Sequence, residues 1–368
     1  MIDISQISRP TLLLNEDVAR MNLSGIIRKF ASKKIAINPH FKTHQSHEIG
    51  RWFQDFGFQA ITVSSVKMAE YFLEDGWKDI SIAFPFNIRE LEAIHKMPVD
   101  IHLTLNVVTP DTVNHLAKYL KRPVQIMIEV DAGYGRTGVS VDDYNMIEQI
   151  LSTINRSGLM SFYGFYIHPG HTYDTNSMDQ IGHIYEQTLQ SLSKLKQRYI
   201  GDWPDLKISL GDTPGCTLME EFDGIDEVRP GNFIFYDMVM HHLNVCSLDQ
   251  IAVAVAVPIV DKQESRKEIV FHGGAIHFSK DYAEDMDGRV HYGWPCILNE
   301  NGWVLPDGQS YVRKLSQEHG IARCSDAFFN QVSVGDCIAV LPVHSCLTAD
   351  CMKSYLSLTG EKITMMQL

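Results

Sequence analysis

Short apolar runs alternate with amphipathic stretches over most of the first 245 residues of this chain. In the longest amphipathic stretch, apolar residues recur at three- and four-residue spacing, as one helix face requires; they are Met178, Ile181, Tyr185, Leu189, Leu192 and Leu195. The apolar runs, which are typical of buried strands, occupy residues 59–63, 79–83, 100–105, 124–130, 163–167, 206–210 and 227–229, and one more ends shortly before Lys42. About eight such β/α units close a barrel, so the pattern predicts an α/β fold, a (β/α)8 TIM-type barrel.

From about Cys246 the pattern changes to apolar runs that are separated by turn residues, with little helical periodicity between them. These runs occupy residues 251–257, 269–271, 302–304 and 336–341. Short apolar runs bounded by turn residues indicate strands. We therefore expect a barrel over residues 9–245 and a second, β-rich domain over residues 246–368.

The composition excludes several classes of function. The net charge is -13, with 45 acidic against 32 basic residues, which argues against a nucleic-acid partner. Seven cysteines, an odd number without CxxC spacing, argue against a disulfide framework and a structural zinc module. Residues 1–6 lack the basic character of a signal peptide, and no apolar run approaches the roughly 18 residues of a membrane span. We expect a cytoplasmic protein that acts on a small molecule.

Residues that can carry chemistry follow the apolar runs. In a TIM barrel, active groups lie just beyond the C-terminal ends of the strands. Lys42, between His40 and His44, stands where an amine can form an imine with an aldehyde cofactor, and burial would lower its pKa and free the lone pair. The other residues at predicted strand ends are Ser64, Ser65, Arg136, His168, His171, Gly211, Asp212, Thr213, Arg229, Pro230 and Gly231.

His344 and Cys346 form a separate pair of candidate metal ligands. On a strand or an extended loop, this spacing points both side chains the same way. Imidazole and thiolate suit zinc, and two protein ligands leave positions open for water and a substrate hydroxyl, as a catalytic site requires.

Four segments in matching order make the chain similar to the D-serine dehydratases and D-threonine aldolases. These are fold-type III enzymes of pyridoxal 5′-phosphate (PLP), distantly related to alanine racemase. The segments are NPHFKTHQS at 38–46, EVDAGYGRTG at 129–138, EVRPG at 227–231 and PVHSC at 342–346. The resemblance thus spans nearly the whole chain. It implies that about the first eight residues add a strand to the β-rich domain and that the protein forms a homodimer.

The resemblance assigns cofactor roles. Lys42 becomes the lysine that forms the imine with PLP. Arg136 is the candidate for the ring nitrogen, by resemblance to the aldolases, and Arg229 is the alternative because alanine racemase uses an arginine in a similar Arg-Pro-Gly segment. A guanidinium keeps its proton, so either arginine would leave the pyridine unprotonated.

The PLP phosphate is expected to meet Tyr166 and two turns, whose glycines allow close backbone approach and one of which leads into a helix N-terminus. Family members often carry serine where this chain has Asp212, so a hydroxyl contact is lost there. Since a carboxylate beside a phosphate is unfavourable, Asp212 is expected to act only through its backbone. The residues of the two turns are Gly211, Asp212, Thr213, Gly231 and Asn232.

The resemblance also suggests the reaction. His171 lies where the aldolases place a histidine that faces the substrate, and it can exchange a proton near neutral pH. His344 and Cys346 would hold a divalent metal, zinc first, with manganese or magnesium as alternatives. The dehydratases carry His-x-Cys at this point and the aldolases His-x-Asp, which favours a lyase that dehydrates D-serine or D-threonine to a keto acid and ammonia.

Three alternatives stay open at this point. A D-threonine aldolase would cleave the same substrates to glycine and an aldehyde. An amino-acid racemase needs no metal but needs a second base, for which Tyr282 is available. A non-catalytic PLP-binding protein would resemble the barrel alone, and the β-rich domain argues against it.

Overall fold

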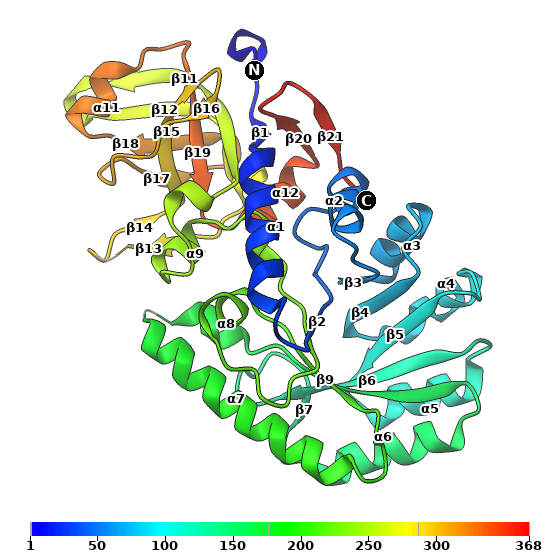
Figure 1. Cartoon of the computed structure of the whole chain (residues 1–368). Coiled ribbons are helices and arrows are strands. Elements are labelled where there is room, and N and C mark those ends of the chain that lie inside the picture. Colours follow the sequence, from blue (N-terminus) through cyan, green and yellow to red (C-terminus); the bar gives the residue numbers. More distant parts are fainter. Residues whose placement is uncertain (1, 176, 286, 368) are drawn as a thin grey trace. The chain divides into compact units, whose positions relative to one another are not determined.

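A computed structural model describes residues 2–175, 177–285 and 287–367 of the chain (Figure 1). The chain divides into two compact units. The barrel unit consists of Ile26–Lys42 and Gly50–Gly231, and the β-rich unit of Met1–Gly25, Thr43–Ile49 and Asn232–Leu368. The chain therefore passes between the units four times, and one crossing directly follows Lys42. The predicted domain boundary at 245 and 246 stays a prediction.

Eight parallel strands form the barrel unit in the order β2-β10-β9-β8-β6-β5-β4-β3, and a bridge between His40 and Thr62 brings the two ends of this series together. The predicted (β/α)8 barrel is thereby confirmed. The strands are β2 (Ala36–Ile37), β3 (Ala60–Val63), β4 (Asp79–Pro85), β5 (His102–Val107), β6 (Val124–Asp131), β8 (Met160–Ile167), β9 (Lys207–Leu210) and β10 (Glu227–Val228), with the short β7 (Val139–Ser140) paired to β6.

Helices connect the barrel strands, and Figure 1 shows α6 and α7 along the outer side of the strands. Their starts follow from the sequence, because Ser65, Asp143 and Ser177 cap α3, α6 and α7 through side-chain oxygens. The helices are α1 (Glu16–Phe30), α2 (His47–Asp55), α3 (Val66–Glu74), α4 (Leu91–Lys96), α5 (Pro110–Tyr119), α6 (Tyr144–Arg156), α7 (Met178–Tyr199) and α8 (Thr213–Leu218), with 3-10 turns η2 (Ile88–Glu90) and η3 (Gly170–Asp174). Of these, α1 and α2 each contain a crossing between the units.

The predicted face of α7 is largely confirmed. Ile181, Tyr185, Leu192 and Leu195 are buried, whereas Met178, in the first turn, is 47% exposed.

The β-rich unit contains a sheet with the strand path β16-β15-β19-β11-β1-β20-β21, to which β12, β18 and β17 attach through β11. The predicted β-rich second domain is confirmed. Its strands are β1 (Thr11–Leu14), β11 (Val253–Gln263), β12 (Glu268–His272), β13 (Ala283–Glu284), β14 (Val290–His291), β15 (Gly293–Asn299), β16 (Gly302–Trp303), β17 (Tyr311–Leu315), β18 (His319–Arg323), β19 (Cys337–Pro342), β20 (Ser354–Ser357) and β21 (Lys362–Thr364). Its helical elements are η1 (Ile4–Gln6), η4 (Asn232–Ile234), α9 (Met238–His242), η5 (Leu248–Gln250), η6 (Glu264–Arg266), α10 (Ala275–Phe278), α11 (Asp326–Gln331) and α12 (Ser345–Met352).

The strand that the N-terminus adds lies later than predicted. The short turn η1 occupies Ile4–Gln6, and the N–H of Ser5 donates to the carboxylate of Asp3. The first strand is β1, which begins at Thr11. The reason is burial, because Leu12, Leu13 and Leu14 are at most 1% exposed between β11 and β20.

Among the described residues, no helix combines the length and the apolar character that a membrane crossing requires.

Candidate active site

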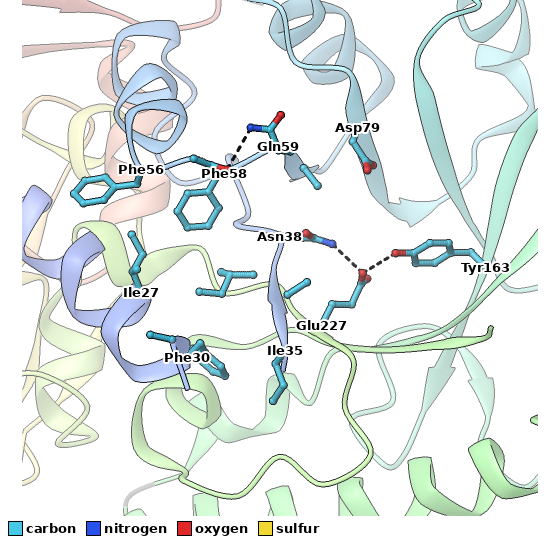
Figure 2. Close-up of a pocket in the computed structure, with 15 residues that line it drawn as sticks. Ile27, Phe30, Ile35, Asn38, Phe56, Phe58, Gln59, Asp79, Tyr163 and Glu227 are labelled. Carbon is cyan, nitrogen blue, oxygen red and sulfur yellow. Dashed lines mark hydrogen bonds between the residues drawn. The ribbon is translucent and has the colours of Figure 1, made fainter. Parts of the chain in front are cut away.

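A cavity of about 500 Å³ in the barrel unit lies at the N-terminal ends of the strands, where Ala36, Ala60, Asp79 and Glu227 begin β2, β3, β4 and β10. Figure 2 shows the carboxylate of Glu227 between Asn38 and Tyr163. It accepts a hydrogen bond from each, at 2.9 and 2.8 Å. None of the predicted site residues lines this cavity, so size alone does not locate the site.

Arg229, one of the two predicted partners of the PLP ring nitrogen, is bound inside the barrel. Its side chain is 1% exposed and forms an ion pair with Glu227, and it also donates to Oγ of Ser209 and, at 3.0 Å, to Oγ1 of Thr62. Its guanidinium carbon lies 5.6 Å from the centre of the Tyr166 ring. Burial acts to raise the pKa of Glu227, but the charge of Arg229 and these hydrogen bonds outweigh it and lower that pKa.

Arg136, the other predicted partner, is much less constrained. Its side chain is 49% exposed, and the nearest acidic contact is Glu129 at 4.0 Å. The guanidinium lies over the ring of Tyr134, 5.4 Å from its centre. Burial raises the pKa of Glu129, and the charge of Arg136 opposes that rise. The two arginines therefore differ in freedom, since only Arg136 can take a new partner without breaking a buried ion pair.

Lys42 lies just beyond the His40–Thr62 bridge, at the C-terminal end of β2, and is exposed. Its backbone N–H donates to Nδ1 of His40 at 3.3 Å. Burial, followed by the charge of Lys42, lowers the pKa of His40 well below its usual value, so His40 is neutral near pH 7. His44 belongs to the β-rich unit, is buried, and accepts a hydrogen bond from the N–H of Ser46.

Three rings, from η3 and from the segments that follow β6 and β8, meet at the C-terminal side of the barrel. Tyr134 stacks on His171 with ring centres 5.9 Å apart and meets the edge of His168 at the same distance. A Cβ on Gly170 would lie 2.3 Å from the Tyr134 ring, so only glycine fits there. Burial lowers the pKa of His168 to about 4 and also lowers that of His171. Nδ1 of His171 is buried and finds no hydrogen-bond partner among the described residues.

The turn after β9 carries the first group of predicted phosphate contacts. Asp212 is the N-cap of α8, and its carboxylate accepts from the N–H of Gly215 at 2.7 Å and from Thr172 at 3.0 Å. Burial raises the pKa of Asp212 to about 6 despite these two donors. Its side chain is therefore already used in holding the turn together.

Thr213 and Gly211 complete this turn. The N–H of Thr213 donates to the hydroxyl of Tyr173 at 3.0 Å, and that of Gly211 to Ile167 at 2.9 Å, so these two backbone groups are paired. Oγ1 of Thr213, by contrast, is buried without a partner among the described residues. A Cβ on Gly211 would lie 3.2 Å from the hydroxyl of Tyr166. The turn thus offers a phosphate a side-chain hydroxyl beside a tyrosine, and this donor set fits PLP.

The second predicted phosphate turn ends at a crossing between the units, with Gly231 in the barrel unit and Asn232 in the β-rich unit. The side-chain amide of Asn232 donates to Asp237 at 2.6 Å and to Ser345 at 3.1 Å, and it lies 3.8 Å from Sγ of Cys346. Its side chain therefore contacts the segment with the predicted metal ligands.

His344 and Cys346 lie at the start of α12 in the β-rich unit. The prediction that they share a strand or extended loop is wrong, because His344 is the N-cap residue and Cys346 is in the first helical turn. The helix begins here because the carboxylate of Asp237 accepts a hydrogen bond from the backbone N–H of Ser345 at 3.0 Å.

The two side chains nevertheless come together. Nδ1 of His344 lies 2.8 Å from the carboxylate of Asp281, so Nε2 is the nitrogen that could bind a metal once its proton is lost. Burial acts to lower the pKa of His344, but the bond to Asp281 and the neighbouring Cys346 outweigh it and raise that pKa to about 10. The thiol of Cys346 is buried, 3.3 Å from Oγ1 of Thr43. An imidazole held by a carboxylate beside a thiol fits a metal such as zinc.

Sequence reasoning missed the residues that orient these groups. Tyr134 is part of a quoted motif, but its stacking on His171 has no spacing signal. Asp281 lies far from His344 in the chain, and Tyr173 far from Thr213. Only the fold brings these residues to their partners.

The comparisons with known proteins agree with this architecture. The family model described as "Alanine racemase, N-terminal domain" matches residues 15–238, and that described as "Putative serine dehydratase domain" matches residues 252–358. A D-serine dehydratase of Dictyostelium discoideum is 27% identical over 96% of this chain and 94% of its own length.

Solved structures show the same fold. The D-threo-3-hydroxyaspartate dehydratase of Delftia sp. HT23 covers all of both chains with a TM-score of 0.89 at 23% identity, and a cysteine-to-alanine mutant of that enzyme was solved in a metal-free form. The D-threonine aldolase of Filomicrobium marinum covers 98% of this chain and 96% of its own with a TM-score of 0.84 at 17% identity. Because one family model matches more than half of its residues, the chain belongs to the alanine racemase N-terminal domain family, and its C-terminal part matches the serine dehydratase domain, which confirms the predicted resemblance.

Proposed function

We propose that this protein is a PLP- and metal-dependent lyase that dehydrates D-3-hydroxy amino acids, such as D-serine and D-threonine, to a keto acid and ammonia. The observation that carries the proposal is the pair at the start of α12, where Asp281 orients His344 beside the thiol of Cys346. A racemase needs no such pair. The likeness to a D-serine dehydratase and a D-threo-3-hydroxyaspartate dehydratase supports the same reaction class.

We assign PLP to the barrel unit, with Lys42 as its covalent attachment point. PLP withdraws electrons from the bonds at Cα of an attached amino acid. Thr213 and Tyr166 supply phosphate contacts, with the turns at Gly211, Asp212 and Gly231 around them. Arg136 meets the ring nitrogen in preference to Arg229, because the guanidinium of Arg229 is already bound by Glu227, Ser209 and Thr62.

His344 and Cys346 hold a divalent cation, most suitably zinc because of the thiolate. A cation held there would supply Lewis-acid activation of a substrate 3-hydroxyl. The side chain of Asn232 donates toward Cys346, so its role in this proposal is to support the metal pair as well as the phosphate turn.

Proton transfer falls to Lys42 and His171. When free of the cofactor, the amine of Lys42 would be the base that takes the proton from Cα of the substrate. His171 stays neutral near pH 7 because burial lowers its pKa, and Tyr134 fixes its ring. In a dehydratase its ring N–H can donate to the departing hydroxyl, whereas in an aldolase the ring would accept the hydroxyl proton.

A D-threonine aldolase is the second candidate, favoured by the structural likeness to the Filomicrobium enzyme. Cys346, at the position where the aldolases carry aspartate, favours dehydration. A racemase would need a second base, and the exposed Tyr282 is the available residue. We also propose a cytoplasmic homodimer and a domain boundary near residue 245.

One assay separates these candidates. Purified protein is incubated with D-serine, D-threonine and D-3-hydroxyaspartate, with and without a chelator, and the products are identified. Keto acid and ammonia, lost with chelator and restored by zinc, support the dehydratase. Glycine and aldehyde support the aldolase, and the opposite enantiomer alone supports a racemase.

A further inference from the structure

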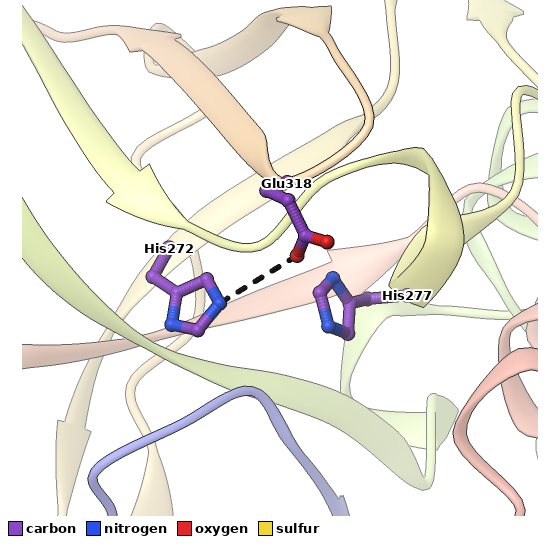
Figure 3. A group of neighbouring side chains, drawn as sticks. All are labelled: His272, His277 and Glu318. Atoms are coloured by element: carbon purple, nitrogen blue, oxygen red, sulfur yellow. Dashed lines mark ion pairs between the residues drawn. The ribbon is translucent and has the colours of Figure 1, made fainter.

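His272, His277 and Glu318 form a cluster in the β-rich unit that the proposed reaction does not use. Within the described part of the chain, it is the one group of three or more histidine, cysteine or acidic side chains whose ligand atoms all lie within 4.8 Å of one another. Figure 3 shows the three side chains converging from different segments. His272 ends β12, His277 is in α10, and Glu318 directly precedes β18.

The backbone around the cluster is tightly held. The N–H of Gly273 donates to the carbonyl of Glu318 at 2.8 Å, and the N–H of Ala275 donates to that of Ser316 at 2.7 Å. A Cβ on Gly274 would lie 2.3 Å from the carbonyl oxygen of Gln317, so the two segments approach more closely than any other residue would allow. The three side chains therefore start from fixed positions, which reduces the entropy that a ligand must overcome.

The distances suit a single ion. Nε2 of His272 lies 3.7 Å from the carboxylate of Glu318. Ligands of a tetrahedral zinc ion, each at about 2.1 Å, are about 3.4 Å apart. The cluster thus needs only small side-chain rotations, and two of its three ligands are nearly in place.

The hydrogen bonding of His277 is compatible with an ion. The N–H of Gly274 donates to its Nδ1 at 3.1 Å, so an ion at Nε2 requires the ring proton to move to Nδ1. That exchange costs one hydrogen bond, which is small against the binding of a first-row divalent ion by two imidazoles and a carboxylate.

We propose that His272, His277 and Glu318 bind a divalent transition-metal ion, with zinc as the best match, at a site separate from His344 and Cys346. Two imidazoles and one carboxylate are a common ligand set for such ions. Glu318 is exposed and both histidines are partly exposed, so water completes the coordination.

The ion would tie α10 to the segment before β18. The chain beyond α10 leads to the proposed catalytic metal pair, since the carbonyl of Phe278 accepts from Thr348 in α12 at 3.2 Å and Asp281 holds His344. The site is therefore placed to stabilise the β-rich unit and the segment that orients His344.

Metal content of the PLP-loaded protein tests the site directly. After dialysis against zinc followed by metal-free buffer, wild-type protein should retain about two equivalents and Cys346→Ala about one, and Cys346→Ala combined with His277→Ala should retain almost none. Working in the Cys346→Ala background measures this site whether or not the protein is a dehydratase. Retention of the same zinc by the single and the double variant would overturn the proposal.

Two further variants guard against misfolding. Glu318→Gln keeps the size and exposure of the side chain and should weaken zinc binding at least about tenfold, whereas His183→Ala, an exposed histidine of α7 in the barrel unit, should leave it unchanged. Zinc should raise the unfolding temperature of the Cys346→Ala protein by about 5 °C, and this rise should vanish with Glu318→Gln. An equal rise in both proteins would contradict the site.

Discussion

Two buried acids at opposite ends of the barrel, Glu227 and Asp212, have pKa shifts in opposite directions. At the N-terminal ends of the strands, Glu227 is matched by Arg229, Asn38 and Tyr163, and its pKa is lowered. At the C-terminal ends, Asp212 has only neutral donors, and burial raises its pKa to about 6. The cavity described above lies at the N-terminal end, where Asn38 and Tyr163 are hydrogen-bonded to Glu227.

Four buried polar atoms near the predicted site at the other end have no partner among the described residues. Oε2 of Glu129, Nδ1 of His171, Oδ1 of Asp212 and Oγ1 of Thr213 are buried without partners among the described residues. Because buried polar groups are normally paired, such atoms indicate a place where a ligand completes the hydrogen bonding. The contrast teaches that the paired groups around Glu227 stabilise the barrel, whereas the unpaired atoms near the turn at Asp212 and Thr213 can bind a ligand, and the predictions below test the two sides of it.

The largest effect is expected for Lys42→Ala, at the C-terminal end. Loss of the attachment point should abolish the absorbance of covalently bound PLP and lower turnover by at least about a thousandfold. Visible spectra and product assays measure both effects. Lys34→Ala, an exposed lysine on the approach to β2, should behave as wild type. Retention of the PLP spectrum by Lys42→Ala would place the cofactor elsewhere.

The two arginines give the next largest effect. Arg229→Gln leaves the carboxylate of Glu227 buried without its cation and should lower the free energy of unfolding by about 3–5 kcal/mol. Arg136→Gln removes an exposed side chain and should change that free energy by less than about 0.5 kcal/mol while shifting the PLP absorbance. Urea unfolding measures the free energy of unfolding of each variant, and visible spectra measure the shift in PLP absorbance. Equal destabilisation by both variants would remove the contrast between the two ends.

Asp212 predicts a pH dependence of stability. Its folded pKa, about 6, is raised above the unfolded value of 3.8, so its contribution to stability is complete below pH 3.8 and is lost as pH rises through about 6. The PLP-free protein should therefore lose about 1–2 kcal/mol between pH 5 and pH 8 from this group. Asp212→Asn keeps the cap and should flatten that part of the profile, as urea unfolding at several pH values can measure. An unchanged slope would mean that Asp212 ionises normally.

The smallest effect is expected for Thr213→Val. Because Oγ1 of Thr213 has no partner among the described residues, the PLP-free protein should lose little stability. Affinity for PLP should fall about tenfold, the value of one hydrogen bond to a charged group. Thr213→Ser, which keeps the hydroxyl, serves as the control. Titration with PLP measures the affinity of each variant. Equal affinities of the Thr213→Val and Thr213→Ser proteins would exclude a phosphate contact by Thr213.

Much of the barrel was predictable because most of its strands contain short runs of buried apolar residues, a pattern that parallel strands covered on both faces favour. The placement of Lys42, His171 and Thr213 after such runs followed from the same rule. The helical start at Ser345 was not predictable, since it depends on Asp237, more than 100 residues earlier. The contact of Asp281 with His344 was not predictable either. Nor was that of Glu318 with His272, because these two residues meet only through the pairing of β12 with β18.

The four crossings between the units have a consequence for how the protein is made. Leu13 in β1 pairs with Ala254 in β11 and Leu356 in β20, so one of the first apolar segments to leave the ribosome must wait for nearly the whole chain before it is covered. Such distant pairing slows folding and leaves an apolar strand exposed to other chains. No single truncation separates the units, because the residues from Thr43 to Ile49 interrupt the barrel near its first strand. The two units therefore depend on each other for folding, and we expect that no truncated chain would contain one complete unit without part of the other.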